Sequence, residues 1–343
     1  YANKSWELLA EPSTYLFGNA DDMAWEVDFP GYGRTFPHPY GPADGKYFTT
    51  LLTLAPAGDE IVLDFAKSLI AAEKVGADEV TDYLSISFSS TDYVGHFFGP
   101  SSLESEDNLH RLDRTLADLL AYVDKTVGLD RTLIVLSADH GASEVPGYLN
   151  SLGIGGNYFK FDEVDKSAAI AALKKEFGVS KELVDKFFQP YVYLNRQTIE
   201  KRGLDIAKVS RRVAEELSKF PGVAFAVSSH DLRAGAVART PVTDAVLANF
   251  HEDRSGDIYI VFEPHWFVAD FDGKSVAGSH GSPWPYDSHV PVIWMGPAIE
   301  TGRVERRVAT VDVAPTIAAY LRVRPPSGSL GRVMEEVTTS ADD

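Results

Sequence analysis

The sequence predicts an α/β protein: a mostly parallel sheet flanked by helices, with an inserted α+β cap subdomain. Short apolar runs follow stretches of helical spacing, first at 83–88 and again at 132–137. A continuous apolar run of this length is typical of a buried parallel strand. Alternation of helix and strand favours the α/β class. The pattern breaks in the middle of the chain and returns near the end, which indicates an insertion.

Residues 1–58 come first and are rich in Gly, Pro, Tyr and Phe with little periodicity. A structureless stretch of this length is uncommon within a compact domain. We therefore expect an ordered loop region that lies on a supporting surface outside this chain.

Two helix-and-strand rounds follow. Ile61, Phe65, Leu69 and Ile70 recur at helical spacing before the strand at 83–88. A longer helix precedes the strand at 132–137, and its apolar positions are Leu109, Leu112, Leu116, Leu119, Leu120 and Val123. We expect residues 1–145 to form the first part of the core.

Residues 146–264 differ in character. Helical stretches rich in Lys and Glu at 165–177 and 205–219 alternate with isolated strands at 223–227 and 258–262. These residues are predicted to form the cap subdomain. The α/β pattern returns in 265–343, with a strand at 290–295 and a helix around 312–321, where Asp312 is expected to cap the first amides.

Composition excludes several classes of protein. The 343 residues include 44% hydrophobic residues, which is enough for a packed core. There is no Cys, so a thiol nucleophile and a Cys-ligated metal are excluded. Lys and Arg number 32 against 50 Asp and Glu, and the net charge of −18 argues against a nucleic-acid partner. No apolar run approaches the roughly 20 residues that span a membrane.

The most informative segment, at 89–100, follows the predicted strand at 83–88. It places Asp92 and His96 on a loop at the carboxyl end of that strand, where open α/β sheets bind ligands. Asp139 and His140 follow the strand at 132–137 in the same way. A third loop, at 279–289, offers three further groups, and spacing does not choose among His280, Asp287 and His289. Together the three loops outline a dinuclear metal site.

Other chemistries have weaker signals. The Gly-rich segment 153–156 lacks dinucleotide-binding spacing, and the sequence contains no Walker loop, nucleophile-elbow Ser or metalloprotease helix motif. His110, His230, His251 and His265 are expected to be structural or surface residues, and His38 has no visible partner.

The motifs SSTDYVGHFFGPSS, SADHG and HGSPWPYDSHVP together resemble the alkaline phosphatase superfamily. The similarity is to its type I phosphodiesterase/nucleotide pyrophosphatase-like branch, which contains the single-Thr, zinc-dependent bacterial alkaline phosphatases. It runs from about Trp6 to Thr316.

The resemblance implies a site with two zinc ions. By motif position, Asp92, His96 and His280 hold one ion, while Asp139 and His140 hold the other. It also implies hydrolysis of phosphate monoesters through a phospho-threonine intermediate, with a phosphorylated small molecule as substrate and a periplasmic or secreted location.

The nucleophilic Thr of the resembled family is not recognisable in these residues. We therefore expect it in a further N-terminal segment of the same protein, and we expect this chain alone to be inactive. Three alternatives remain open: a phosphodiesterase or nucleotide pyrophosphatase, a catalytically inactive metal-binding fragment, and a metal-dependent phosphoglycerate mutase.

Overall fold

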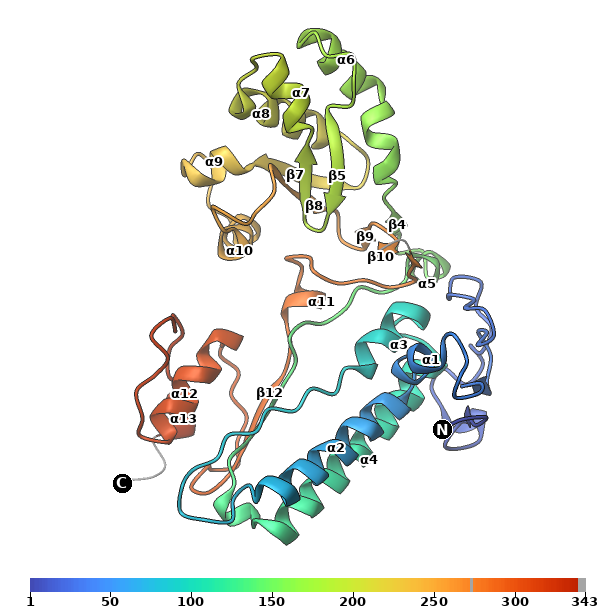
Figure 1. The fold of residues 1–343 in the computed structure, drawn as a ribbon, viewed down its shortest axis with the longest axis vertical. Helices are drawn as coiled ribbons and strands as arrows, with labels where there is room; N and C mark the ends of the chain where they lie inside the picture. The colour runs from blue at the N-terminus through green and yellow to red at the C-terminus, as the bar shows by residue number, and fades with distance from the viewer. Residues whose placement is uncertain (272–273, 339–343) are drawn as a thin grey trace.

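The computed structural model describes residues 1–271 and 274–338, which form two lobes (Figure 1). The lower lobe in this view contains the long helices α2 (Pro56–Glu73) and α4 (Leu103–Thr126), with α3 (Ser90–Phe98) above them. The upper lobe contains a four-stranded sheet and its helices. Helices and sheets are thus combined in one chain, and the predicted α/β class is confirmed.

The two long helices pack side by side, and their predicted apolar stripes are buried only in part. Leu63, Ala66 and Ile70 of α2 are buried, whereas Ile61 and Phe65 are exposed. In α4 the buried residues are largely polar, and Leu109 is exposed. Much apolar surface of these helices therefore remains accessible to solvent within the described chain.

Strand pairing in the lower lobe differs from the prediction. Strands β3 (Ile134–Ser137) and β12 (Val292–Met295) form an antiparallel two-stranded ribbon, with Val292 opposite Ser137 and Met295 opposite Ile134. Among the described residues, only the short pair β4–β9 is parallel. The expectation of a mostly parallel sheet was therefore wrong for these strands, because an apolar run reports burial and carries no information on strand direction.

The segment predicted as a strand at 83–88 joins no ladder with the described residues. Its side chains alternate between exposed and partly buried. A strand needs a neighbour to satisfy its backbone groups, and the local sequence cannot supply one.

The four-stranded antiparallel sheet of the upper lobe has the order β5-β6-β8-β7. Its strands are β5 (Val184–Phe188), β6 (Tyr191–Leu194), β7 (Val223–Ser228) and β8 (Ile258–Phe262). All five residues of β8 are buried, as expected of a central strand. Helices α6 (Ala168–Glu176) and α8 (Ile206–Leu217) pack on this sheet through one apolar core. The sequence predicted both helices and strands β7 and β8 correctly.

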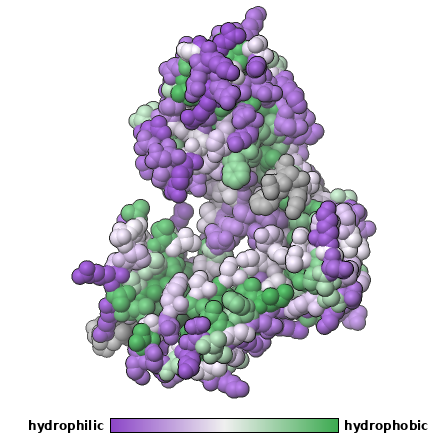
Figure 2. Space-filling model, viewed as in Figure 1, coloured by the Kyte–Doolittle hydropathy of each residue, from purple (hydrophilic) through white to green (hydrophobic). Residues whose placement is uncertain are grey.

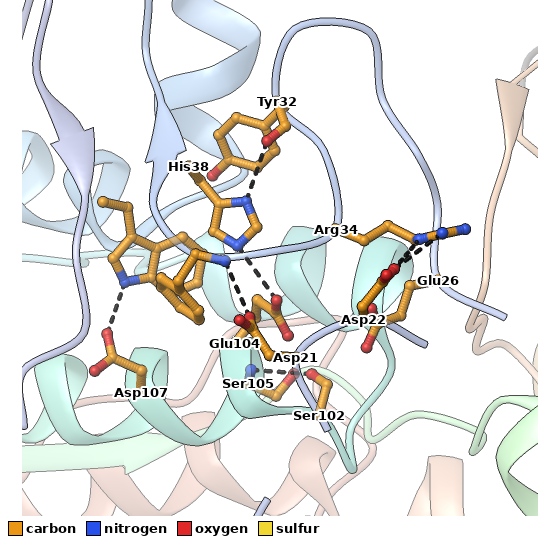
Figure 3. A network of polar contacts seen from close by, with 12 residues as sticks. Asp21, Asp22, Glu26, Tyr32, Arg34, His38, Ser102, Glu104, Ser105 and Asp107 are labelled. Carbon is orange, nitrogen blue, oxygen red and sulfur yellow. Dashed lines mark hydrogen bonds and ion pairs between the residues drawn. The ribbon is translucent and has the colours of Figure 1, made fainter. Parts of the chain in front are cut away.

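The long N-terminal region lies on α3 and α4, so the expectation of a support outside the chain was wrong. The strand pair β1 (Ser5–Trp6) and β2 (His38–Pro39) brings two buried rings onto α4 (Figure 3). The Trp6 indole donates to Asp107 at 2.6 Å, and His38 Nε2 lies 3.2 Å from a carboxylate oxygen of Glu104. His38 therefore has a partner, which local sequence could not indicate because Glu104 is 66 residues away.

Helix α12 (Val313–Tyr320) occupies the predicted position near the end of the chain, but Asp312 does not cap it with its side chain. The Asp312 carboxylate instead accepts from the amides of Ala309 and Arg332.

The remaining described elements are short: α1 (Phe48–Thr53), α5 (Pro146–Ser151), α7 (Arg196–Lys201), α9 (Ser229–Arg233), α10 (Pro241–Asn249), α11 (Pro285–Ser288), α13 (Glu335–Thr338), β4 (Asn157–Tyr158), β9 (Trp266–Phe267), β10 (Asp270–Phe271), β11 (Lys274–Ser275) and the 3-10 helices Pro12–Thr14, Leu129–Arg131, Phe161–Lys166 and Thr310–Asp312.

Candidate metal centre

Helix α3 brings the first two candidate ligands together. The segment was predicted to be a loop, but it is helical, so Asp92 and His96 lie four residues apart on one face. Their side chains approach to 3.4 Å between Oδ2 and Nε2. The opposite side of the helix is fixed by the fully buried Val94 and Phe98, which belong to an apolar cluster with Trp6 and Leu54.

Contacts and backbone geometry also stabilise both ends of α3. The first amide, Ser90 N, donates to the buried Asp59 carboxylate of α2 at 3.1 Å. The helix ends at Gly99, whose φ of 92° is a conformation that glycine adopts without strain. These contacts set the position of the Asp92 and His96 face relative to the rest of the lobe.

The third loop supplies His280. Its Nε2 lies 3.4 Å from Oδ1 of Asp92, so the two imidazoles approach different oxygens of one carboxylate. One ligand atom from each of Asp92, His96 and His280 lies within 4.8 Å of the others. Within residues 1–271 and 274–338, no other three His, Asp or Glu side chains form so compact a group.

A backbone contact sets which nitrogen of His96 faces the group. Nδ1 lies 2.8 Å from the Gly278 carbonyl, a partner that can only accept, so Nδ1 carries the proton and donates. Nε2 then holds the lone pair on the side of Asp92. A histidine ligand whose other nitrogen is fixed by a carbonyl is a recurring feature of metal sites.

Asp139 and His140 follow β3, as predicted, and lie beside this group. The His140 ring stacks on the His280 ring with centroids 3.5 Å apart and planes 12° from parallel. His140 Nε2 is 3.5 Å from Asp139 Oδ2, and the Asp139 side chain is 89% exposed. The structure thus brings all five predicted residues to one region, three of them as a compact group and two as an adjoining pair.

The electrostatics of the group favour an ionised Asp92 carboxylate and a neutral His280 imidazole. Burial opposes the charge on Asp92, but hydrogen bonding and charge from His96, with charge from His280 and His140, outweigh it and lower the pKa of Asp92. Burial lowers the pKa of His280 to about 4, against the opposing effect of Asp92. For His96 burial acts in the same direction, but the Asp92 carboxylate and the Gly278 carbonyl outweigh it and raise its pKa.

The other two candidate ligands of the third loop do not join Asp92, His96 and His280, which are called the trio below. His289 is exposed. Asp287 is buried at 3% exposure, with one carboxylate oxygen accepting from Ser282 N at 2.7 Å and the other without a hydrogen-bond partner. The Asp287 carbonyl accepts from Gly141 N at 2.7 Å, so this residue ties the third loop to the second.

Sequence reasoning missed the residues that surround the third loop. His265 has a φ of 63°, stacks on Tyr286 at 4.5 Å and places Nδ1 3.2 Å from Ser143 Oγ. Gln189, from the cap sheet, donates to the carbonyl of His280. A cavity beside the loop is lined by residues that include Ser143, Gln189, Phe262, Trp266 and Tyr286. Neither Gln189 nor Ser143 stands in a motif, so no local signal marked them.

Comparison with known proteins supports the family that the sequence motifs resemble. Residues 17–283 match the type I phosphodiesterase / nucleotide pyrophosphatase family, and the chain belongs to that family. It is 34% identical over 339 residues to a protein of Myroides odoratus named calcium-transporting ATPase, covering 98% of this chain and 61% of that protein. It is also 34% identical over 338 residues to the alkaline phosphatase PhoV of Synechococcus elongatus, covering 98% and 60%.

Among solved structures, wild-type alkaline phosphatase PafA matches with a TM-score of 0.87 and 32% identity, covering 98% of this chain and 63% of that one. The chain thus spans about three-fifths of the length of these relatives. The alkaline-phosphatase-like fold expected from the sequence motifs is confirmed. No helix in the described part of the chain is both long and apolar enough to cross a membrane.

Proposed function

We propose that the protein hydrolyses phosphate monoesters, with zinc held by Asp92, His96 and His280 and a second zinc held by Asp139, His140 and groups outside this chain. The observation that carries the proposal is the compact trio, because its ligand atoms lie within 4.8 Å of one another. The alkaline phosphatases PhoV and PafA among the relatives support the choice of reaction.

The residues of the trio fit a zinc ion. Two imidazole nitrogens and a carboxylate oxygen are the donors that Zn²⁺ takes in proteins, and three protein ligands leave a position open, as in catalytic sites. Two features suit the ligand atoms to a cation. The Gly278 carbonyl accepts the proton on Nδ1 of His96, which leaves Nε2 toward the site, and the low pKa of His280 keeps its ring neutral. His140, stacked on His280, extends the donor set toward the second proposed ion.

Bound zinc supplies positive charge, which stabilises the oxygens of a phosphoryl group during transfer. The protein's part is positioning. Helix α3 holds Asp92 and His96, and the 279–289 loop brings His280 to them. An anionic substrate can then bind to a chain of net charge −18, because local charge at the site outweighs the distant surface.

The nucleophile is proposed to be a Thr in a part of the protein outside these 343 residues, and the intermediate a phospho-threonine. Thr91, although next to Asp92, accepts a hydrogen bond from the Asn108 amide at 3.0 Å, which suits a structural role. We accordingly propose that this chain alone is inactive and that the whole protein acts in the periplasm or outside the cell.

The test compares p-nitrophenyl phosphate with bis-p-nitrophenyl phosphate as substrates of the longest natural gene product that contains this chain, with zinc supplied. We expect faster hydrolysis of the monoester, and loss of activity when a chelator removes zinc. A strong preference for the diester would instead identify a phosphodiesterase, which the family match keeps as the second candidate. Hydrolysis of neither substrate, in a protein that retains zinc, would point to the inactive metal-binding alternative.

A further inference from the structure

Gln189 lies where the cap meets the metal centre. It stands in the turn between β5 and β6, and its side-chain Nε2 donates to the main-chain carbonyl of His280, 91 residues away. Within residues 1–271 and 274–338, no other side chain of the upper lobe donates to the backbone of Asp92, His96 or His280. The contact therefore links the upper lobe directly to one candidate ligand.

The two partners are held closely against each other. The next residue of the turn, Pro190, accepts from Ile260 N of the central strand β8 at 3.0 Å, so the turn is fixed to the sheet. On the other side, Gly281 has a φ of 95°, and a Cβ at this position would lie 2.7 Å from Gln189 Nε2. A side chain at 281 would therefore displace the Gln189 amide, and the absence of one allows it to reach the backbone.

The rest of the third loop is also held from both lobes. The Trp284 indole, in the same loop, donates to the carbonyl of Phe262 in β8 at 3.0 Å. From the lower lobe, Ser143 N donates to Ser279 O at 2.8 Å. His280 lies between these contacts, and among the described residues Gln189 is the donor to its carbonyl.

We propose that Gln189 is a positioning residue that holds the His280 peptide in the orientation from which the imidazole reaches Asp92, so that the cap contributes to metal affinity. This inference rests on the proposed metal site. The peptide plane at 280–281 sets the direction of the His280 side chain, and a donor on its carbonyl restricts that plane. Partners that orient metal ligands typically affect metal affinity by about 10–100-fold.

The experiment measures cobalt binding by visible absorption, with zinc competition, in wild type and in the variants Gln189→Met and Gln189→Glu. Methionine keeps the length of the side chain but cannot donate, and glutamate places an acceptor against the carbonyl. We expect affinity about tenfold weaker for Gln189→Met and at least as weak for Gln189→Glu, with an altered cobalt spectrum. The control is Phe188→Ala, a neighbouring residue of β5 that is 73% exposed, and it should bind as wild type does.

The outcomes separate this inference from the function on which it rests. Wild-type affinity and an unchanged spectrum in both Gln189 variants, each with wild-type far-ultraviolet circular dichroism, would overturn the positioning role and leave the metal site intact. A wild-type protein that binds neither cobalt nor zinc would overturn the metal site itself. If Gln189→Met does not fold, Gln189→Glu, which keeps a polar side chain, provides the same comparison.

Discussion

At the scale of single residues, backbone carbonyls and burial set the protonation of several histidine and glutamate side chains. The Gly278 carbonyl selects the tautomer of His96, and burial keeps His280 neutral. The same physics acts away from the centre, where the N-terminal region packs on α4. Here burial lowers the pKa of His38 to about 4, while Glu26 and Glu104 have raised pKa values because burial disfavours their charged forms.

Glu26 gives a prediction about stability and pH. Burial, with the charge of Glu104, raises its pKa from 4.5 to about 9, so the folded protein keeps a proton that the unfolded chain releases. Its contribution is fully present below pH 4.5 and is lost as pH rises to about 9, at up to about 1.4 kcal/mol per pH unit. Glu26→Gln keeps the neutral shape, so it should gain in Tm over wild type by about 2 °C per pH unit across this window.

Thermal unfolding of both proteins at several values from pH 5 to pH 9 checks this expectation. Near pH 5 the two should unfold at similar temperatures, and the gap should widen toward pH 9. The opposite pKa shift of His38 is common to both proteins and cancels in the difference. A gap that stays constant across the range would mean that Glu26 ionises normally in the folded state.

At the scale of elements, helical spacing identified α2 and α4 but predicted their buried faces only in part. The predicted α2 stripe included Ile61 and Phe65, which are exposed, and Ile70, which is buried together with Leu63 and Ala66. Spacing identifies a helix, but which side meets a neighbour depends on the neighbour. The same holds for the segment of Asp92 and His96, where helical geometry, rather than a loop, places both side chains on one face.

Two substitutions, two residues apart and on different faces of α2, test this assignment. Leu63→Ala removes a side chain that is 5% exposed and should lower the free energy of unfolding by about 2–5 kcal/mol. Phe65→Ala removes a larger side chain that is 67% exposed, and the change should stay within about 0.5 kcal/mol. Urea unfolding of each variant measures both values. A larger loss for Phe65→Ala than for Leu63→Ala would mean that α2 buries the predicted stripe.

At the scale of the whole molecule, the candidate metal centre joins segments that are distant in sequence. Asp92 and His96 belong to α3 of the lower lobe, while His280 lies in a loop held by both lobes. The hydrophobic surface in Figure 2 is concentrated on the lower lobe, whereas the visible face of the upper lobe is largely hydrophilic. Leu136, Ile293 and Met295 of the β3–β12 ribbon are among the exposed apolar residues.

Since the trio spans 188 residues of chain, from Asp92 to His280, metal binding should stabilise the whole fold. Zinc at about 100 times its Kd should raise the free energy of unfolding by about 2.7 kcal/mol and shift Tm upward. The shift should disappear in His280→Ala and persist in His289→Ala, because His289 is exposed and outside the trio. Calorimetry with and without zinc checks this, and an equal shift in the two variants would argue against the trio as the binding site.

The sequence by itself determined the α/β class, helices α6 and α8 and, through its motifs, the five side chains that lie together at the candidate centre. These are local properties, since periodicity and a motif beside a strand or helix are contained in short windows of residues. The tertiary structure alone decided the antiparallel β3–β12 pairing, the partner of His38 and the contact from Gln189. Each of these depends on two segments meeting across tens of residues or more, and the energy of such a contact is encoded in neither segment alone.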